Sequence, residues 1–384
     1  PTAAHSPVPD PSAESPAFGG RSSRNRILFV SPAATGSLGR ANDLPSRADI
    51  ACITTWVVVS KRMPPSVLII GAGMAGITSG RALRAAGLDV LLLDKGRAVG
   101  GRMATRRIGE ATFDHGAQHI SVRTAGFAEE MEALVQRGTA GVWYRSESIT
   151  QPERGTENRY AGIGGMRRIP EALADGLSVI TEIHVERLTL DAGGMAAHAE
   201  GDVVATADAV ILTPPLPQTR RLLAAGDLPV GREVDALLHP EYDATLAVMA
   251  VLDEPPMPAD GHRAFDSGPI SWMADNQQKG VSAIPAMTIH SSSEFAASRL
   301  DSDPRRWMAE LLEAARPFHD GTVVEAVAHR WRFAQPQTTL DVGALAVGAS
   351  VPLVLAGEAF AGARVEGAHI SGAVAAQLIL DRLG

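Results

Sequence analysis

A glycine-rich segment between two aliphatic runs constrains the fold of this chain more than any other feature. Residues 67–70 predict a buried strand, and Gly71, Gly73 and Gly76 follow it in the spacing G-x-G-x-x-G. The first glycine allows a tight turn, the second lets the backbone approach a pyrophosphate, and the third lets helix and strand pack closely. The start of the helix offers unpaired N–H groups to the phosphates. Asp94, about 20 residues further on, is placed to accept hydrogen bonds from ribose hydroxyls. The segment therefore predicts a dinucleotide-binding βαβ unit.

A second glycine pair follows this unit. Gly100 and Gly101 precede Arg102, and such a pair can wrap the same pyrophosphate from its other side. A structural turn stays the alternative for the first motif taken alone, because glycine-rich turns are common. Together the two motifs resemble the FAD fingerprint of the amine-oxidase superfamily, which implies a Rossmann-type FAD-binding domain.

Length, charge and cysteine content narrow the function classes. With 384 residues, of which 45% are hydrophobic, the chain is long enough for two domains with cores of their own. A formal net charge of −8 argues against a nucleic-acid partner, and no apolar run is long enough to span a membrane. The lone cysteine, Cys52, excludes an intrachain disulfide and a cysteine-based metal site. We therefore expect a cytoplasmic protein without a metal, which holds its cofactor noncovalently.

Residues 1–62 differ in composition from the rest of the chain. Pro, Ser and Ala dominate, and no core is evident, so we expect a disordered extension. Met63 directly precedes the first predicted strand. Two explanations of the extension stay open: translated upstream sequence and a transit segment.

The segments after Arg102 predict a discontinuous cofactor domain and a second domain. Strands are expected near 142–144, 179–185, 208–213, 244–252, 284–290, 323–333 and 353–358, and helices over 126–137, 304–316 and 366–383. The later strands indicate an antiparallel sheet with a helical cover. The predicted fold class is α/β, with an FAD-binding domain from residues 63–125, 176–217 and 345–384 and a substrate domain from 126–175 and 218–344.

The last predicted helix has a glycine-rich start. Near Gly367 its positive end would point at the edge of an isoalloxazine ring where reduction places negative charge. The alternative is an ordinary αβ closing element whose glycines serve tight packing.

Several motifs resemble the renalase family over residues 63–384. Besides the first glycine motif, they are Asp114-His-Gly-Ala-Gln118, Trp272-Met-Ala-Asp-Asn276 and the segments 329–334 and 357–372. Glu358 stands where many flavoproteins have aspartate, and its longer carboxylate should still reach ribityl or phosphate groups. His119 stands where several relatives have tyrosine, a departure that bears on substrate stacking.

The renalase resemblance implies a specific oxidation. FAD would take hydride from isomers of NADH or NADPH that are reduced at a wrong ring carbon, and O₂ would reoxidise the flavin to give H₂O₂. Loss of hydride restores aromaticity, so no protein base is required and positioning supplies most of the catalysis. The candidate positioning residues are Gln118, His119, Trp272, His290 and Trp331. For His290 and the tryptophans, a place in an ordinary sheet core is the alternative.

The residues expected to contact FAD come from both glycine motifs, the turn at 116–118 and the C-terminal segment. Val185 is added from the family resemblance alone, as part of the strand whose backbone faces adenine. Arg102 can neutralise the pyrophosphate. The full set is Gly71, Gly73, Met74, Ala75, Gly76, Asp94, Lys95, Gly101, Arg102, Met103, Gly116, Ala117, Gln118, Val185, Gly357, Glu358, Glu366, Gly367 and Ala368.

Two other functions stay open at this point: a flavin oxidase for amines or polyenes, and a non-redox protein that binds FAD or NAD. The lysine often found near the flavin of amine oxidases has no evident counterpart, because from Met63 onward the chain has only Lys95 and Lys279. Lys95 abuts the ribose acid, and Lys279 lies in a polar, turn-like stretch. This weakens the amine hypothesis.

Overall fold

The computed structural model describes residues 64–147, 155–191, 193–228, 230–256, 261–348 and 350–384. The predicted disordered extension, with Cys52 and Met63, lies outside these residues. No helix in the described ranges is long and apolar enough to cross a membrane.

A six-stranded sheet forms the nucleotide-binding part of the chain. Its strand order is β18-β19-β12-β1-β2-β8, and all neighbours pair in parallel except β18 with β19. The strands are β1 (Ser66–Ile70), β2 (Asp89–Leu93), β8 (Ser178–Ile180), β12 (Ala209–Leu212), β18 (Leu345–Val347) and β19 (Leu353–Leu355). Strands from three separate stretches of sequence, residues 66–93, 178–212 and 345–355, thus join one sheet.

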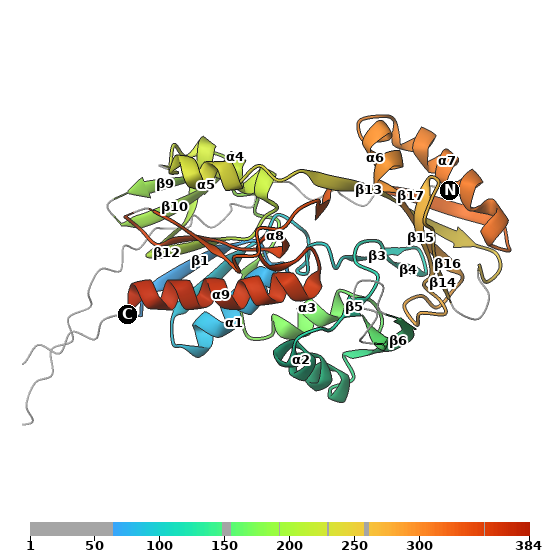
Figure 1. Cartoon of the computed structure of the whole chain (residues 1–384), viewed down its shortest axis with the longest axis horizontal. Helices are drawn as coiled ribbons and strands as arrows, with labels where there is room; N and C mark the ends of the chain where they lie inside the picture. Colours follow the sequence, from blue (N-terminus) through green and yellow to red (C-terminus); the bar gives the residue numbers. More distant parts are fainter. Residues whose placement is uncertain (1–63, 148–154, 192, 229, 257–260, 349) are drawn as a thin grey trace, which may run out of the picture. The chain divides into compact units, whose positions relative to one another are not determined.

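Both faces of this sheet are buried, which explains the unbroken aliphatic runs. Val67 and Ile69 of β1 pack under α1 (Met74–Ala85) and α9 (Val365–Leu383), which lie side by side in Figure 1. Leu68 and Ile70 face the other layer. That layer comprises β9 (Arg187–Asp191), β10 (Gly194–Ala199), β11 (Asp202–Ala207), α4 (Leu216–Ala225) and α8 (Glu358–Ala361), and α5 (Arg232–Leu237) follows α4.

A smaller region adds to the buried core that lies between the six-stranded sheet and the helices α1 and α9. Its elements are α2 (Ala125–Gln136), β5 (Ile120–Ser121), β6 (Ala140–Glu147), β7 (Thr156–Gly162) and α3 (Arg168–Leu173). Phe127 and Met131 belong to the same buried cluster as Ile69. The predicted domain boundary at residue 126 is therefore not marked by a break in the core, and the division into domains stays a prediction.

The antiparallel sheet has the order β14-β15-β16-β13-β17. One of its faces is covered by α6 and α7, where Trp307 is buried. The hairpin of β3 and β4 packs against β16 and leads toward this sheet in Figure 1. The elements are β3 (Thr105–Ile108), β4 (Ala111–Asp114), β13 (Tyr242–Leu252), β14 (His262–Ala264), β15 (Ile270–Asp275), β16 (Ala286–Ser291), α6 (Ser293–Arg299), α7 (Pro304–Ala315), the short 3₁₀ helix Arg316–Phe318 and β17 (Val323–Pro336).

Two predicted strands end earlier than expected. The strand predicted over 353–358 ends at Leu355, and Glu358 instead begins α8 after the turn at Gly357, whose φ is 143°. The alternating pattern over 179–185 predicts a strand to Val185, but β8 ends at Ile180. Glu182 adopts a left-handed backbone conformation with φ 61°, and the N–H groups of Glu182 and Ile183 donate to the carbonyls of Gly96 and Asp94. The chain therefore leaves the sheet and turns over the end of β2, which alternation alone does not reveal.

Candidate functional site

The first glycine motif forms a backbone cradle with room at one position. A Cβ at Gly71 would lie 2.3 Å from the Thr213 hydroxyl, and one at Gly76 would lie 2.0 Å from the Gly71 carbonyl oxygen. A Cβ at Gly73 would meet nothing within 4 Å. Gly73 also precedes α1, whose start has no side-chain cap. Open space beside uncapped N–H groups, with Met74 and Ala75 in the first turn, fits a pyrophosphate.

The second glycine pair closes on the first. The Gly100 N–H donates to the Ala72 carbonyl at 2.8 Å, and a Cβ at Gly101 would lie 3.5 Å from the Gly73 Cα. Gly100 and Gly101 have φ values of 107° and 53°, a region that side-chain-bearing residues rarely adopt. Met103 is buried directly behind them. The structure thus brings the two predicted motifs together.

Arg102, which follows the second glycine pair, and Glu358, the first residue of α8, pair with each other. One guanidinium nitrogen lies 2.7 Å from the Glu358 Oε1 and the second contacts Oε2, while the Tyr242 hydroxyl donates to Oε1 at 3.3 Å. Burial alone would raise the pKa of Glu358, but the charge and hydrogen bonds of Arg102 outweigh it and hold that pKa below its usual value. The sequence predicted separate contacts of the two residues with FAD and did not indicate this ion pair.

Asp94, the acid predicted to contact ribose hydroxyls, directly follows β2. The Asp94 carboxylate accepts from the N–H groups of Ala72 and Gly96, each at 2.6 Å, and each oxygen keeps a second lone pair for a hydroxyl. Lys95 donates to Gln218 at 3.0 Å on the exposed side. Val185 is buried in the cluster that contains Leu93.

The start of α9 lies against α8 and α2. A Cβ at Gly367 would lie 1.9 Å from the Gly362 carbonyl oxygen, and the Gly357 N–H donates to the Ser371 hydroxyl at 2.9 Å. Glu366 is 2% exposed, and its Oε1 accepts from the Thr124 N–H, the Thr124 hydroxyl and the Arg123 N–H. The contacts of Glu366 within the described residues thus hold the start of α2. Ala368 lies in the first turn of α9.

The turn after β4 lies on the second glycine motif. The Ala117 N–H donates to the Arg102 carbonyl at 2.8 Å, and a Cβ at Gly116 would lie 1.9 Å from the same oxygen. Gln118 donates through Nε2 to the carbonyls of Asp114 and Gly116. Gly116 to Gln118, predicted as cofactor contacts, therefore adjoin the pyrophosphate cradle.

Two of the predicted positioning residues converge on this turn from the antiparallel sheet. The Trp331 Nε1 donates to the His115 carbonyl at 2.7 Å, and the His290 Nε2 lies 3.0 Å from the same oxygen. The His115 ring stacks on Trp331 at 5.2 Å and meets His329 edge-on at 4.6 Å. His115 and His329 lie inside two motifs that carry the renalase resemblance, but sequence reasoning assigned neither a role.

Two further predicted positioning residues, His119 and Trp272, lie in a group of rings that we call the aromatic group. His119 lies 5.7 Å from Trp272, between ring centres, and His262 stacks on Trp272 at 5.1 Å. Tyr144 lies 3.9 Å from His262, and Trp143 lies 5.0 Å from Tyr144. Sequence reasoning noted an aromatic strand near 142–144 but did not connect it to the site, and it missed His262. The group comprises His119, Trp143, Tyr144, His262 and Trp272.

Burial is the main cause of low pKa values at three histidines. Together with the charges of neighbouring side chains, it lowers the pKa of His115 to about 3 and that of His119 and His290 to about 4. Burial also raises the pKa of the Tyr144 hydroxyl to about 12. At neutral pH these side chains are therefore uncharged hydrogen-bonding groups.

Among the buried polar atoms without a hydrogen-bond partner in the described part of the chain, three lie at this turn or in the aromatic group beside it: the Gln118 Oε1, the His115 Nδ1 and the Trp272 Nε1. The Gln118 amide is oriented by two carbonyls that both accept from Nε2, so its free atom is the oxygen. Buried polar atoms without a partner cost free energy. Their clustering beside the turn points to a ligand that supplies both a donor and an acceptor.

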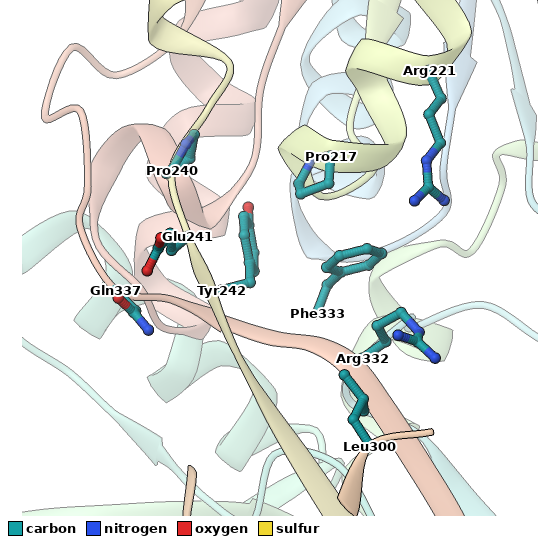
Figure 2. Close-up of a pocket in the computed structure, with 9 residues that line it drawn as sticks. All are labelled: Pro217, Arg221, Pro240, Glu241, Tyr242, Leu300, Arg332, Phe333 and Gln337. Atoms are coloured by element: carbon teal, nitrogen blue, oxygen red, sulfur yellow. The ribbon is translucent and has the colours of Figure 1, made fainter. Parts of the chain in front are cut away.

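A separate cavity of about 400 Å³ lies behind the Arg102–Glu358 pair. Figure 2 shows the Phe333 ring between Pro217 of α4 and Arg332 of β17, with Tyr242 on the opposite side of Phe333 from Arg221 and Arg332. Tyr242 connects this cavity to Glu358. None of the predicted site residues lines it.

Comparisons with known proteins agree with this architecture. A sequence profile of NAD(P)-binding Rossmann-like domains matches residues 69–137, and the profile of flavin containing amine oxidoreductases matches residues 136–380. A protein described as a protoporphyrinogen oxidase, from Exiguobacterium sp. 255-15, has a TM-score of 0.63 at 12% identity. Wild-type putrescine oxidase bound to putrescine has a TM-score of 0.56 at 18% identity. Each alignment covers 83% of this chain and 99% of the other. At such identities the likeness shows the fold, and the predicted fold class is confirmed.

A curated relative matches a short segment only. Hydroxyneurosporene desaturase from Rubrivivax gelatinosus is 42% identical over 57 residues, which are 15% of this chain and 11% of that protein. The match therefore spans a small part of the length of that relative.

Proposed function

Because the chain belongs to the family of flavin containing amine oxidoreductases, and is thus an FAD-dependent oxidoreductase, we propose that it is an oxidase of the renalase type. Its substrate would be a dihydronicotinamide dinucleotide reduced at a wrong ring carbon. Family membership removes the non-redox alternative. The cytoplasmic location and the noncovalent attachment of FAD remain parts of this proposal.

The observation that carries the proposal is the set of unpartnered atoms beside the aromatic group. A nicotinamide ring bears a carboxamide, which offers an N–H donor and a carbonyl acceptor. The Gln118 Oε1 can accept and the Trp272 Nε1 can donate. The half-buried rings of His119 and Trp272 suit a flat heterocycle.

The protein's part in the reaction is positioning. His290 and Trp331 hold the His115 carbonyl and so keep the turn that carries Gln118 and His119 in place. No protein base is needed, because the substrate loses a hydride and becomes aromatic. When bound, FAD supplies the acceptor for this hydride and passes two electrons to O₂, which takes up two protons to give H₂O₂.

Amine or polyene oxidation is the second candidate. The fold likeness to putrescine oxidase and the segment shared with a hydroxyneurosporene desaturase favour it. The two candidates differ in the electron donor, so a direct test separates them.

The test is anaerobic mixing of the FAD-loaded protein with each donor class. Isomeric dihydronicotinamides should bleach the flavin absorbance in a single turnover, while putrescine and ordinary NADH should do so far more slowly. Rapid bleaching by an amine, with none by the isomers, would replace the first candidate with the second.

A further inference from the structure

Lys279 is a buried cation between the turn after β4 and the aromatic group. Its side chain is fully buried and lies in the turn between β15 and β16. The Nζ lies 2.8 Å from the Asp114 Oδ2 and 4.6 Å from the centre of the Trp143 ring. The sequence predicted the turn correctly and did not indicate the burial of its lysine.

Asp114 forms hydrogen bonds both to the nucleotide-binding side of the chain and to the antiparallel sheet. Its Oδ1 accepts from the Thr105 hydroxyl of β3 at 2.5 Å and, on the nucleotide side, from the Met166 N–H at 2.8 Å. On the side of the antiparallel sheet, the Asp114 N–H donates to the Asn276 Oδ1 at 3.0 Å, and the Asp114 carbonyl accepts from the Thr288 hydroxyl at 2.9 Å.

The remaining contacts of this network are short as well. The Asn276 side chain donates to the Thr288 hydroxyl at 2.9 Å, and the Asp114 carbonyl also accepts from Gln118 at 2.7 Å. The base of the turn that carries Gln118 and His119 is therefore bound by side chains from β4, the turn between β15 and β16, and β16.

A lysine in such a place is costly unless something compensates it. Burial lowers the pKa of Lys279, and the charge of Asp114 opposes that effect. The face of an indole ring is a further favourable partner for an ammonium group. A methionine would fill the same volume without this cost, so the charge suggests a role that packing alone does not explain.

We propose that Lys279 is a positioning residue of the candidate site: its ammonium group joins Asp114 to Trp143 and so fixes the turn of Gln118 and His119 against the aromatic group. The kinetic test of this inference measures flavin reduction and therefore rests on the proposed function. The structural test, by circular dichroism, is independent of that function.

The central variant is Asp114→Asn with Lys279→Met, because removing both charges leaves no unpaired buried ion. We expect it to fold and to retain FAD. Its rate of anaerobic flavin reduction at saturating donor, normalised to bound flavin, should fall by about 100-fold, the loss that a displacement of about 1 Å can cause. The near-ultraviolet circular dichroism of the aromatic residues should change with it. The single variant Lys279→Arg, which keeps the charge, should retain more of the wild-type rate than the double variant.

The matched control is Arg299→Met with Glu310→Gln. Arg299 pairs with Glu310 at 2.7 Å and its guanidinium lies 4.0 Å over the Phe295 ring, but it belongs to the helical cover. We expect it to leave the rate and the aromatic spectrum unchanged.

A double variant that reduces its flavin at the wild-type rate, with a wild-type aromatic spectrum, overturns the proposal. If it does not fold, Lys279→Gln replaces it under the same criteria, because an amide can still donate to Asp114. If no donor reduces the wild-type flavin, the proposed function fails by itself. The aromatic spectrum then decides the role of Lys279: a change supports it and an unchanged spectrum overturns it.

Discussion

The pyrophosphate cradle and the site at the antiparallel sheet are built in different ways. The cradle consists mainly of backbone from one stretch of sequence, with Gly71, Gly73 and Gly76 placed where a Cβ would collide or fill the open space. The second site consists of side chains that are distant in sequence, since His115 meets His290 and Trp331. The difference teaches that a backbone site is readable from a motif, whereas a side-chain site depends on which strands pair.

The largest effect should come from adding side chains to the cradle. Gly76→Ala places a Cβ 2.0 Å from a backbone oxygen, which should cost about 1–3 kcal/mol or more of unfolding free energy and abolish FAD retention. Gly73→Val enters open space. It should leave the FAD-free protein as stable as wild type but weaken FAD binding by about 100-fold, or about 3 kcal/mol.

Thermal melting without FAD and titration with FAD measure these two effects. Gly126→Ala, where a Cβ also meets nothing within 4 Å, is the control. Wild-type FAD affinity in Gly73→Val would show that the phosphates do not lie there.

The ion pair between the two cofactor segments comes next. Arg102→Met leaves the Glu358 carboxylate, 7% exposed, without its partner. The loss of unfolding free energy should be near the lower end of about 3–5 kcal/mol, because the Arg102 side chain is 29% exposed. Arg102→Met with Glu358→Gln should recover most of it in denaturant titrations of the FAD-free protein. A double variant no better than the single one would contradict this account.

The same pair gives a pH dependence of known sign. The folded-state pKa of Glu358 is lowered, so the stabilisation is present above the unfolded value of about 4.3 and disappears as the pH falls through the folded value. The difference in unfolding free energy between the wild type and Arg102→Met should therefore be largest above about pH 4.3 and should shrink as the pH falls toward the folded-state pKa of Glu358.

A smaller effect tests the side-chain site. Trp272→Phe keeps a ring and removes only the unpartnered N–H. If this group donates to the substrate, the donor concentration at half-saturation of flavin reduction should rise about tenfold, the worth of one hydrogen bond at about 1.4 kcal/mol. Trp307→Phe removes a similarly unpartnered N–H in α7 and should leave that concentration unchanged. Equal effects of the two variants would contradict a hydrogen bond from the Trp272 N–H to the substrate.

The smallest effect concerns the buried histidines. With pKa values of about 3 for His115 and about 4 for His119 and His290, flavin reduction should show no histidine titration between about pH 6 and 8. Because the folded values lie below the unfolded value of about 6.5, stability should fall as the pH drops from there toward the folded values. His119→Phe should make this fall shallower in denaturant titrations, and an unaltered slope would argue against a buried neutral His119.

Much of the nucleotide side could be predicted because its determinants are local. Aliphatic runs, glycine spacing and an acid at the end of β2 recur wherever a dinucleotide is held by backbone. The choice of Gln118, His119, Trp272, His290 and Trp331 as candidate positioning residues came with the family resemblance. In the structure His290 and Trp331 contact the His115 carbonyl, and His119 lies beside Trp272. Their roles remain proposals.

Other features were not predictable from the pattern. A lysine in a polar turn looks solvent-exposed, and only the docking of β4 beside β16 brings Asp114 to Lys279. Likewise Arg102 and Glu358 are each plausible FAD contacts alone, and their pairing requires segments 256 residues apart in the sequence to meet.

By itself the sequence determined the Rossmann-type unit, the glycine-rich turn that starts α1 and the membership of a flavin-binding class, since these depend on neighbouring residues and backbone conformation. The tertiary structure alone decided which rings form the aromatic group, which charges are buried and which polar atoms lack a partner. The physical reason is that burial and pairing arise from contacts between strands far apart in the chain, and no local pattern encodes those distances.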